Sequence, residues 1–297
     1  MGNCHSSPDT QPTRPVQRRS VAPAQATPTI PKSISPPRYA PSNQDAWAPP
    51  PYSAQNVADP VSTDSPYAFL REFDTIFLVD DSTSMAGSRW REAEDAIAAI
   101  APICTQYDGD GIDIYFLNHK SPARGPAGGG YNHVCDARGV REIFQSVQPR
   151  GATPVGRRLH QILGPYMRDL ERLAARGEEA ASVKPLNIIV ITDGVFTDDA
   201  ESVVVQVARQ LDLPGLQTVP WQVGIQFFQV GDDPAASLYL QTLDDELEKR
   251  TGNDGLRDIV DTVPWRGDRG RCLDADGILK CVLGAVNRKY DKREASH

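Results

Sequence analysis

The sequence predicts an α/β domain: doubly wound, with a mostly parallel central sheet flanked by helices on both faces, and a disordered N-terminal arm before it. Short apolar runs of strand length alternate with longer runs of helical periodicity. The most apolar run, 186–191, suits a strand that is buried on both faces. Composition changes near residue 66, because residues 1–66 hold 14 of the 25 prolines. Alternating strands and helices imply βαβ units and a parallel sheet.

The arm at 1–66 is rich in Pro, Ser, Gln and Thr and has almost no periodic apolar pattern. Such a segment cannot bury enough apolar surface to offset the entropy lost on ordering. We therefore expect a disordered tether over 1–66 and one folded domain over 67–297. The prolines could also serve as polyproline ligands for small adaptor domains.

Within 67–297 the expected strands and helices follow from the hydrophobic periodicity and from the positions of Pro and Gly. Strand patterns fall at 75–79, 112–117, 186–191, 221–227 and 256–263, and helical stripes at 90–103, 140–147, 155–173, 203–211, 238–247 and 275–290. We expect 186–191 at the sheet centre and 256–263 at an edge. Pro214 ends one helical stripe, and the Pro/Gly-rich segment through Gly130 is expected to be a loop.

Oxygen-bearing side chains cluster beside three of these elements. The segments are Asp80-Asp81-Ser82-Thr83-Ser84 after 75–79, Gly151-Ala152-Thr153-Pro154 before 155–173, and Thr192-Asp193-Gly194 after 186–191. Parallel strands end at one edge of a sheet, so Asp80 and Asp193 should share a rim. Each segment alone would pass for a helix cap or a turn. Together they offer the hydroxyl and carboxylate oxygens that hard cations such as Mg²⁺ prefer.

This combination resembles the metal-ion-dependent adhesion site of von Willebrand factor type A (vWA) domains, including those of fungal-type and copine-like intracellular proteins. The resemblance covers about residues 70–290 and implies a Rossmann-like vWA fold. It implies that Ser82 and Ser84 bind Mg²⁺ (or Mn²⁺) directly and that Thr153 joins them when a ligand is bound. Asp80 and Asp193 would act mostly through waters. The remaining position would take an Asp or Glu from a partner protein, while Asp81 is expected to face solvent or the neighbouring loop.

Composition and missing motifs limit the function classes. A net charge of −8 argues against a nucleic-acid binder. The histidines have no metal or triad spacing, and neither a Gly-x-Ser-x-Gly elbow nor a phosphate-binding loop occurs. We therefore expect a non-catalytic scaffold or adaptor rather than an enzyme. Two alternatives are a phosphoesterase-like hydrolase that uses the same cation as a Lewis acid, and a scaffold that acts mainly through its arm.

The first residues predict attachment to a membrane by acylation. Met1-Gly2-Asn3-Cys4-His5-Ser6 matches the N-myristoylation pattern at Gly2, and Cys4 beside it could take a palmitoyl chain. Two acyl chains give stable anchoring where one gives only reversible binding. The five cysteines fit no zinc pattern, and no apolar run has the length of a membrane span. We expect a cytoplasmic protein held at the inner face of a membrane, with Cys104 and Cys135 as buried thiols.

Overall fold

The computed structural model describes residues 68–122 and 127–263, which form a six-stranded sheet in the order β3-β2-β1-β4-β5-β6. The strands are β1 (Asp74–Val79), β2 (Ile112–Phe116), β3 (Tyr131–Val134), β4 (Leu186–Thr192), β5 (Val223–Gln229) and β6 (Val260–Val263). Only β3 runs antiparallel to its neighbour, and the other pairings in this sheet are parallel. The predicted α/β class with a mostly parallel sheet is confirmed.

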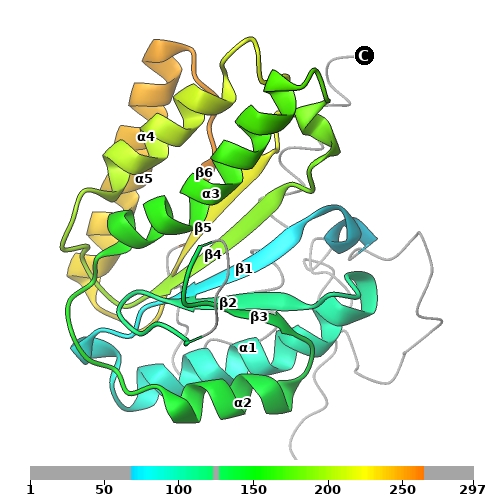
Figure 1. The fold of residues 1–297 in the computed structure, drawn as a ribbon. Helices are drawn as coiled ribbons and strands as arrows, with labels where there is room; N and C mark the ends of the chain where they lie inside the picture. The colour runs from blue at the N-terminus through cyan, green and yellow to red at the C-terminus, as the bar shows by residue number, and fades with distance from the viewer. Residues whose placement is uncertain (1–67, 123–126, 264–297) are drawn as a thin grey trace, which may run out of the picture. The chain divides into compact units, whose positions relative to one another are not determined.

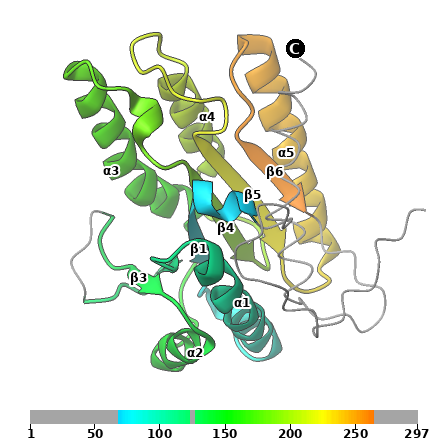
Figure 2. The ribbon, with the colours of Figure 1, turned by 90° about the vertical axis from the view of Figure 1, so that its right-hand side faces the viewer.

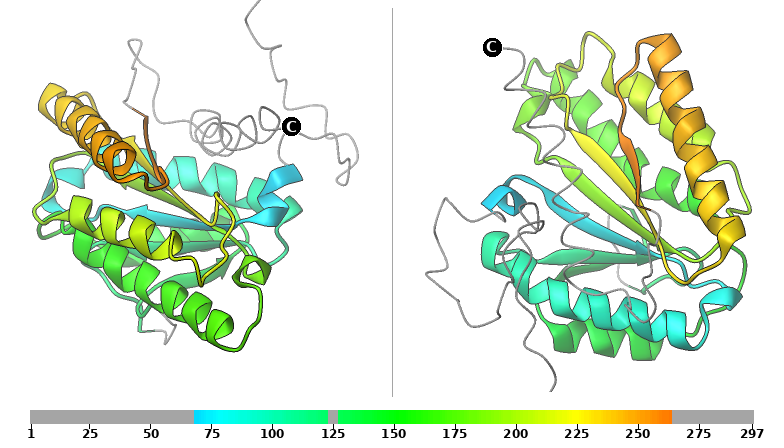
Figure 3. Two further views of the ribbon diagram at one scale, coloured as in Figure 1. Left: turned by 90° about the horizontal axis from the view of Figure 1, so that it is seen from above. Right: turned by 180° about the vertical axis from the view of Figure 1, so that it is seen from behind.

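Helices cover both faces of the sheet (Figures 1 and 2). They are α1 (Ser88–Tyr107), α2 (Ala137–Ser146), α3 (Val155–Ala175), α4 (Ala200–Leu211) and α5 (Pro234–Asp254), with short 3₁₀ turns at Ala68–Glu72, Thr83–Met85 and Ala180–Ser182. α1 and α2 lie on one face, whereas α3, α4 and α5 lie on the other. Views from above and from behind show the same two layers, with β6 at the sheet edge beside α5 (Figure 3).

The central strands are buried on both faces. In β4, Ile188 and Val190 face the layer that contains α3, while Ile189 and Ile191 face the layer that contains α1. All seven residues of β4 are buried, as its unbroken apolar run predicts. The strand therefore sits at the sheet centre, which confirms its predicted place.

The strand order reverses between β1 and β4. From β1 the chain builds outward to β2 and β3 on one side, then returns to β4 and continues to β5 and β6 on the other. The loop after β1 leads to α1, and the loop after β4 leads to α4 on the opposite face. Such a switch point leaves a crevice at the carboxyl ends of the strands, where ligands of open α/β sheets bind.

Several local predictions need correction. β3 was not predicted from the sequence, and the edge strand expected over 256–263 is regular only from Val260. Cys104 is buried as expected, but Cys135 is exposed, because it follows the edge strand β3. The helix predicted over 275–290 and the arm over 1–66 lie outside the described residues. None of the helices between residues 68 and 263 has both the length and the apolar character needed to cross a bilayer.

Candidate metal centre

Asp80 and Asp193 lie side by side at the switch point. The Asp80 amide donates to the Ile191 carbonyl at 2.8 Å, so the β1–β4 ladder continues past the end of β1. Val230 in turn donates to the Thr192 carbonyl at 2.8 Å, which brings the end of β5 to the same edge. The order of the strands thus delivers both predicted carboxylates to one rim.

Ser82, Ser84 and Asp193 form a continuous chain of side-chain contacts. The Ser82 and Ser84 hydroxyl oxygens, called here the serine pair, lie 3.0 Å apart. The Ser84 hydroxyl donates to Asp193 Oδ1 at 2.8 Å across 109 residues of sequence. Ser82 is buried and Ser84 is exposed, so the serine pair lies between the sheet interior and solvent.

Asp80 holds the inner side of this group. Its carboxylate accepts the Ser82 amide at 2.8 Å and the Thr192 hydroxyl at 2.7 Å. The pKa of Asp80 is raised from 3.8 to about 6: burial is the largest cause and the Asp193 carboxylate a smaller one, and they outweigh the hydrogen bonds from Thr192 and Ser82, which lower it. A cation bound at the rim would therefore stabilise the ionised form of this buried carboxylate.

The Thr153 loop reaches this group through its backbone. Thr83, between the two serines, donates its amide to the Gly151 carbonyl at 3.2 Å and accepts the Gly151 amide on its hydroxyl at 3.2 Å. Thr153 itself is buried, and its carbonyl accepts the Thr197 amide at 3.0 Å. Its hydroxyl makes no hydrogen bond with Asp80, the serine pair or Asp193, all of which the structure describes. Four of the five predicted side chains are therefore linked directly, and the fifth lies on an adjoining loop.

Three further residues shape the site and were not assigned from the sequence. Thr192 bonds Asp80, and Arg89 forms an ion pair with Asp193 Oδ2. Asp81 is fully buried rather than solvent-facing: it accepts the backbone amides of Asn118 and His119 at 2.7 and 2.8 Å. For Asp81 the sequence does contain a signal: it is the second of two acidic residues that stand directly after the apolar run 75–79. Nothing local in the sequence signals the Arg89 contact, which spans 104 residues.

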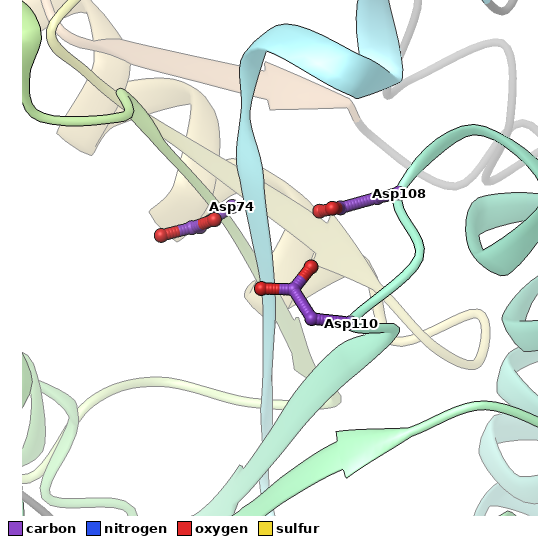
Figure 4. A group of neighbouring side chains, drawn as sticks. All are labelled: Asp74, Asp108 and Asp110. Carbon is purple, nitrogen blue, oxygen red and sulfur yellow. The ribbon is translucent and has the colours of Figure 1, made fainter.

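A second acidic group lies near the start of β1, whereas Asp80 follows the end of this strand; Figure 4 shows the second group. Asp74 begins β1, and Asp108 and Asp110 precede β2; their carboxylate oxygens lie within 4.8 Å of one another, a grouping that could bind a metal. Lys184 already places its ammonium 3.0 Å from Asp74 and 2.6 Å from Asp108. A metal ion here would have to compete with that lysine.

The similarity of this chain to known proteins is low. No protein-family model and no curated protein matches this sequence. Among solved structures, the chain is similar to manganese-loaded TRAP protein from Plasmodium vivax, at 15% identity over 66% of this chain and 70% of that chain, with a TM-score of 0.33. It is also similar to three N-terminal domains of the type V pili tip protein Mfa5 from Porphyromonas gingivalis, at 16% identity over 42% of this chain and 20% of that chain, with a TM-score of 0.23. Identities and scores this low leave the site's chemistry to be judged from its own side chains.

Proposed function

We propose that the folded domain is a non-catalytic vWA-type binding module that holds Mg²⁺ or Mn²⁺ at the serine pair and binds an acidic side chain of a partner protein. The spacing of the serine pair carries this proposal. Neighbouring ligands of an octahedral Mg²⁺ with bonds of about 2.1 Å lie about 3.0 Å apart. The Ser82 and Ser84 hydroxyl oxygens lie 3.0 Å apart, which is this ligand spacing.

The donor set fits a hard cation that keeps its charge. Ser82 and Ser84 would be direct neutral ligands, Thr153 would join them on partner binding, and Asp80 and Asp193 would act through waters. Because the direct ligands are neutral, a bound cation would keep most of its charge and offer an open position to a carboxylate. The Arg89 guanidinium on Asp193 supports the fit, since this rim already holds one cation.

Calorimetric titration tests the site. The wild-type protein should bind one Mg²⁺ or Mn²⁺, and Ser82→Ala and Ser84→Ala should each weaken binding at least about tenfold, since each removes one ligand. Ser88→Ala is the matched control, because Ser88 is exposed at the start of α1. Unchanged affinity in both serine-pair variants would refute the site.

A capture experiment tests the partner. Proteins captured by the wild-type domain in Mg²⁺ should be lost in chelator and lost again with Ser84→Ala. In a captured partner, replacement of one Asp or Glu by Asn or Gln should abolish binding. A partner that survives chelator, Ser84→Ala and every such replacement would contradict a metal-bridged contact.

A metal-dependent hydrolase is the alternative function. It would need a free base or nucleophile beside the cation. The carboxylates here are engaged, Asp80 by Ser82 and Thr192, and Asp193 by Ser84 and Arg89. Turnover of a phosphomonoester in Mn²⁺ that disappears in Asp80→Asn would favour the hydrolase.

We also propose that lipids on Gly2 and Cys4 hold this module at the inner face of a membrane. The support is the acylation pattern of the first six residues. An alkyne analogue of myristate should label the full chain and fail to label Gly2→Ala, while Cys4→Ser should keep the myristate and lose a palmitate analogue. Equal labelling of wild type and Gly2→Ala would end the proposal.

A further inference from the structure

Arg89 places a positive charge at the N-terminus of a helix, where a cation is unfavourable unless another contact offsets the cost. It is the second residue of α1, a helix with no acidic residue in its first turn. Cations near a helix N-terminus are unfavourable, because the exposed amides there carry partial positive charge. The ion pair with Asp193 offsets that cost, and Arg89 also donates to the Ser84 carbonyl at 3.4 Å. The arginine thus touches two of the five candidate site residues.

The burial of the two partners is unequal. The Asp193 side chain is 0% exposed and that of Arg89 is 31% exposed. Asp193 has both oxygens occupied, Oδ1 by the Ser84 hydroxyl and Oδ2 by Arg89. Without Arg89 this carboxylate would be buried beside Asp80 with no cation among the described side chains. The guanidinium therefore balances the negative charge of Asp193, as a bound divalent cation would.

Gly231, two residues beyond the end of β5, shapes the space for the arginine. Its φ is +79°, and a Cβ added there would lie 2.7 Å from Arg89 Nε. The guanidinium is therefore held between Asp193 and the backbone of Gly231. This contact gives a way to displace Arg89 without changing any charge.

We infer that Arg89 is a built-in competitor of the divalent cation: its guanidinium balances Asp193 in the metal-free protein and raises the metal concentration needed to fill the site. The inference rests on the proposed metal site. A positive charge beside the serine pair repels an incoming divalent cation, and that repulsion is weakly screened where the partners are buried. The ion pair also stabilises the rim when no metal is bound, because it balances the buried Asp193 carboxylate.

Mn²⁺ titration followed by the electron paramagnetic resonance of the free ion tests this directly. Arg89→Gln should bind Mn²⁺ at least about tenfold more tightly than wild type, and its melting temperature in chelator should fall. Arg89→Lys keeps the charge and should stay close to wild type in Mn²⁺ affinity. Arg91→Gln is the matched control, since it makes the same charge change at an exposed position of the same helix and should bind as wild type does.

A glycine pair covers the case in which Arg89→Gln does not fold. Gly231→Ala should push the guanidinium off Asp193 and tighten Mn²⁺ binding by about threefold or more. Gly177→Ala is its control, because Gly177 has a similar φ of +73° but open space around the added methyl. Both alanines bear the same backbone strain, so only the displacement of Arg89 separates them.

The outcomes separate this inference from the proposed function. Tighter binding in Arg89→Gln and Gly231→Ala supports the competition. Equal or weaker binding in both, with a wild type that binds Mn²⁺, overturns the competition and leaves the metal site standing. Binding in Arg89→Gln alone, with none in wild type, supports competition and contradicts a metal-loaded native protein. Binding in no variant overturns both.

Discussion

Asp80 illustrates how a binding residue can work against stability. Its carboxylate is fully buried, with two hydrogen bonds and no ion pair to any described side chain. Burial raises its pKa from 3.8 to about 6. The folded chain therefore binds this proton more tightly than the unfolded chain does. The stabilising contribution of the protonated form is present below about pH 4 and is lost as the pH rises through about 6.

Asp80→Asn should consequently stabilise the metal-free protein. Asn can accept the Ser82 amide and donate to Thr192 without a buried charge, so we expect a gain of about 1–3 kcal/mol at pH 8 and a smaller one at pH 5. Urea unfolding in chelator at both pH values measures it. In saturating Mg²⁺ the order should reverse, because the variant loses the ion. A variant less stable than wild type in chelator at pH 8 would contradict the cost assigned to Asp80.

Protons should also compete with the metal. Because the Asp80 pKa lies at about 6 without metal, Mn²⁺ affinity should fall about tenfold from pH 7 to pH 5, as the carboxylate becomes protonated. The same titration at pH 7 and 8 should differ little. A Mn²⁺ affinity that stays constant down to pH 5 would show that the charge of Asp80 does not contribute to binding the ion.

Single residues also mark the limit of what could be read from the sequence. Asp80 and Asp193 could be placed at one rim, because the strand that each follows is strongly apolar and topology does the rest. Arg89 could not, because its partner is distant in sequence and reaches it only after β1 and β4 pair. Thr192 lies in one of the three oxygen-rich segments, but its hydrogen bond to Asp80 could not be predicted, because it depends on the same strand pairing.

At the scale of elements, a glycine sets how closely α3 approaches the start of α4. Gly156 is buried in the first turn of α3, and a Cβ there would lie 2.6 Å from the Asp199 carbonyl oxygen. Asp198 caps this turn by accepting the Gly156 and Arg157 amides at 2.9 and 2.7 Å. Both contacts hold the helix that follows the Thr153 loop.

Gly156→Ala should therefore destabilise the domain by about 1–3 kcal/mol, since the backbone of Asp199 must move to admit a methyl group. Gly164→Ala in the same helix is the control: its added methyl meets only the end of the Arg168 side chain, and alanine favours a helix. Urea unfolding should show a loss for the first variant and little change or a gain for the second. Equal effects would contradict the close approach at Gly156.

A buried arginine joins α3 to β2. Arg158 donates to the Phe116 carbonyl at 2.9 Å, to the Gly128 carbonyl at 3.1 Å and to Gln161 at 2.9 Å. It is 1% exposed, and its guanidinium also lies over the Tyr115 ring. The arginine thereby satisfies carbonyls at the end of a strand and in the loop that follows.

Arg158→Met should cost about 2–4 kcal/mol, because it leaves buried carbonyls without donors. Arg168→Met, at an exposed position of the same helix, should cost little. Denaturant unfolding of the two variants in parallel gives the comparison. A similar small loss in both would mean that water replaces the guanidinium.

Element prediction succeeded where periodicity was strong and failed where it was weak. β4 and α3 each show a long, clean pattern, and the structure places both close to the predicted bounds. β3 has only four residues, two of them exposed, and His133 within it has a φ of +58°. Such an edge strand carries no alternating apolar signal, so only its pairing with β2 reveals it.

At the scale of the whole described domain, two oxygen-rich groups lie at opposite ends of β1. Asp80 follows β1 at the switch point, whereas Asp74 begins β1 in the group with Asp108 and Asp110. Each group holds a basic side chain, Arg89 at the first and Lys184 at the second. Only the first combines its carboxylates with a pair of hydroxyls at ligand spacing. We therefore expect the cation to bind at the serine pair rather than at the group around Asp74.

Anomalous diffraction from crystals of the domain soaked in Mn²⁺ tests this choice most directly. We expect one strong peak within about 2.2 Å of the Ser82 and Ser84 hydroxyl oxygens, with Asp193 in contact through water. A peak among Asp74, Asp108 and Asp110, with none at the serine pair, would contradict the proposed centre and the function built on it.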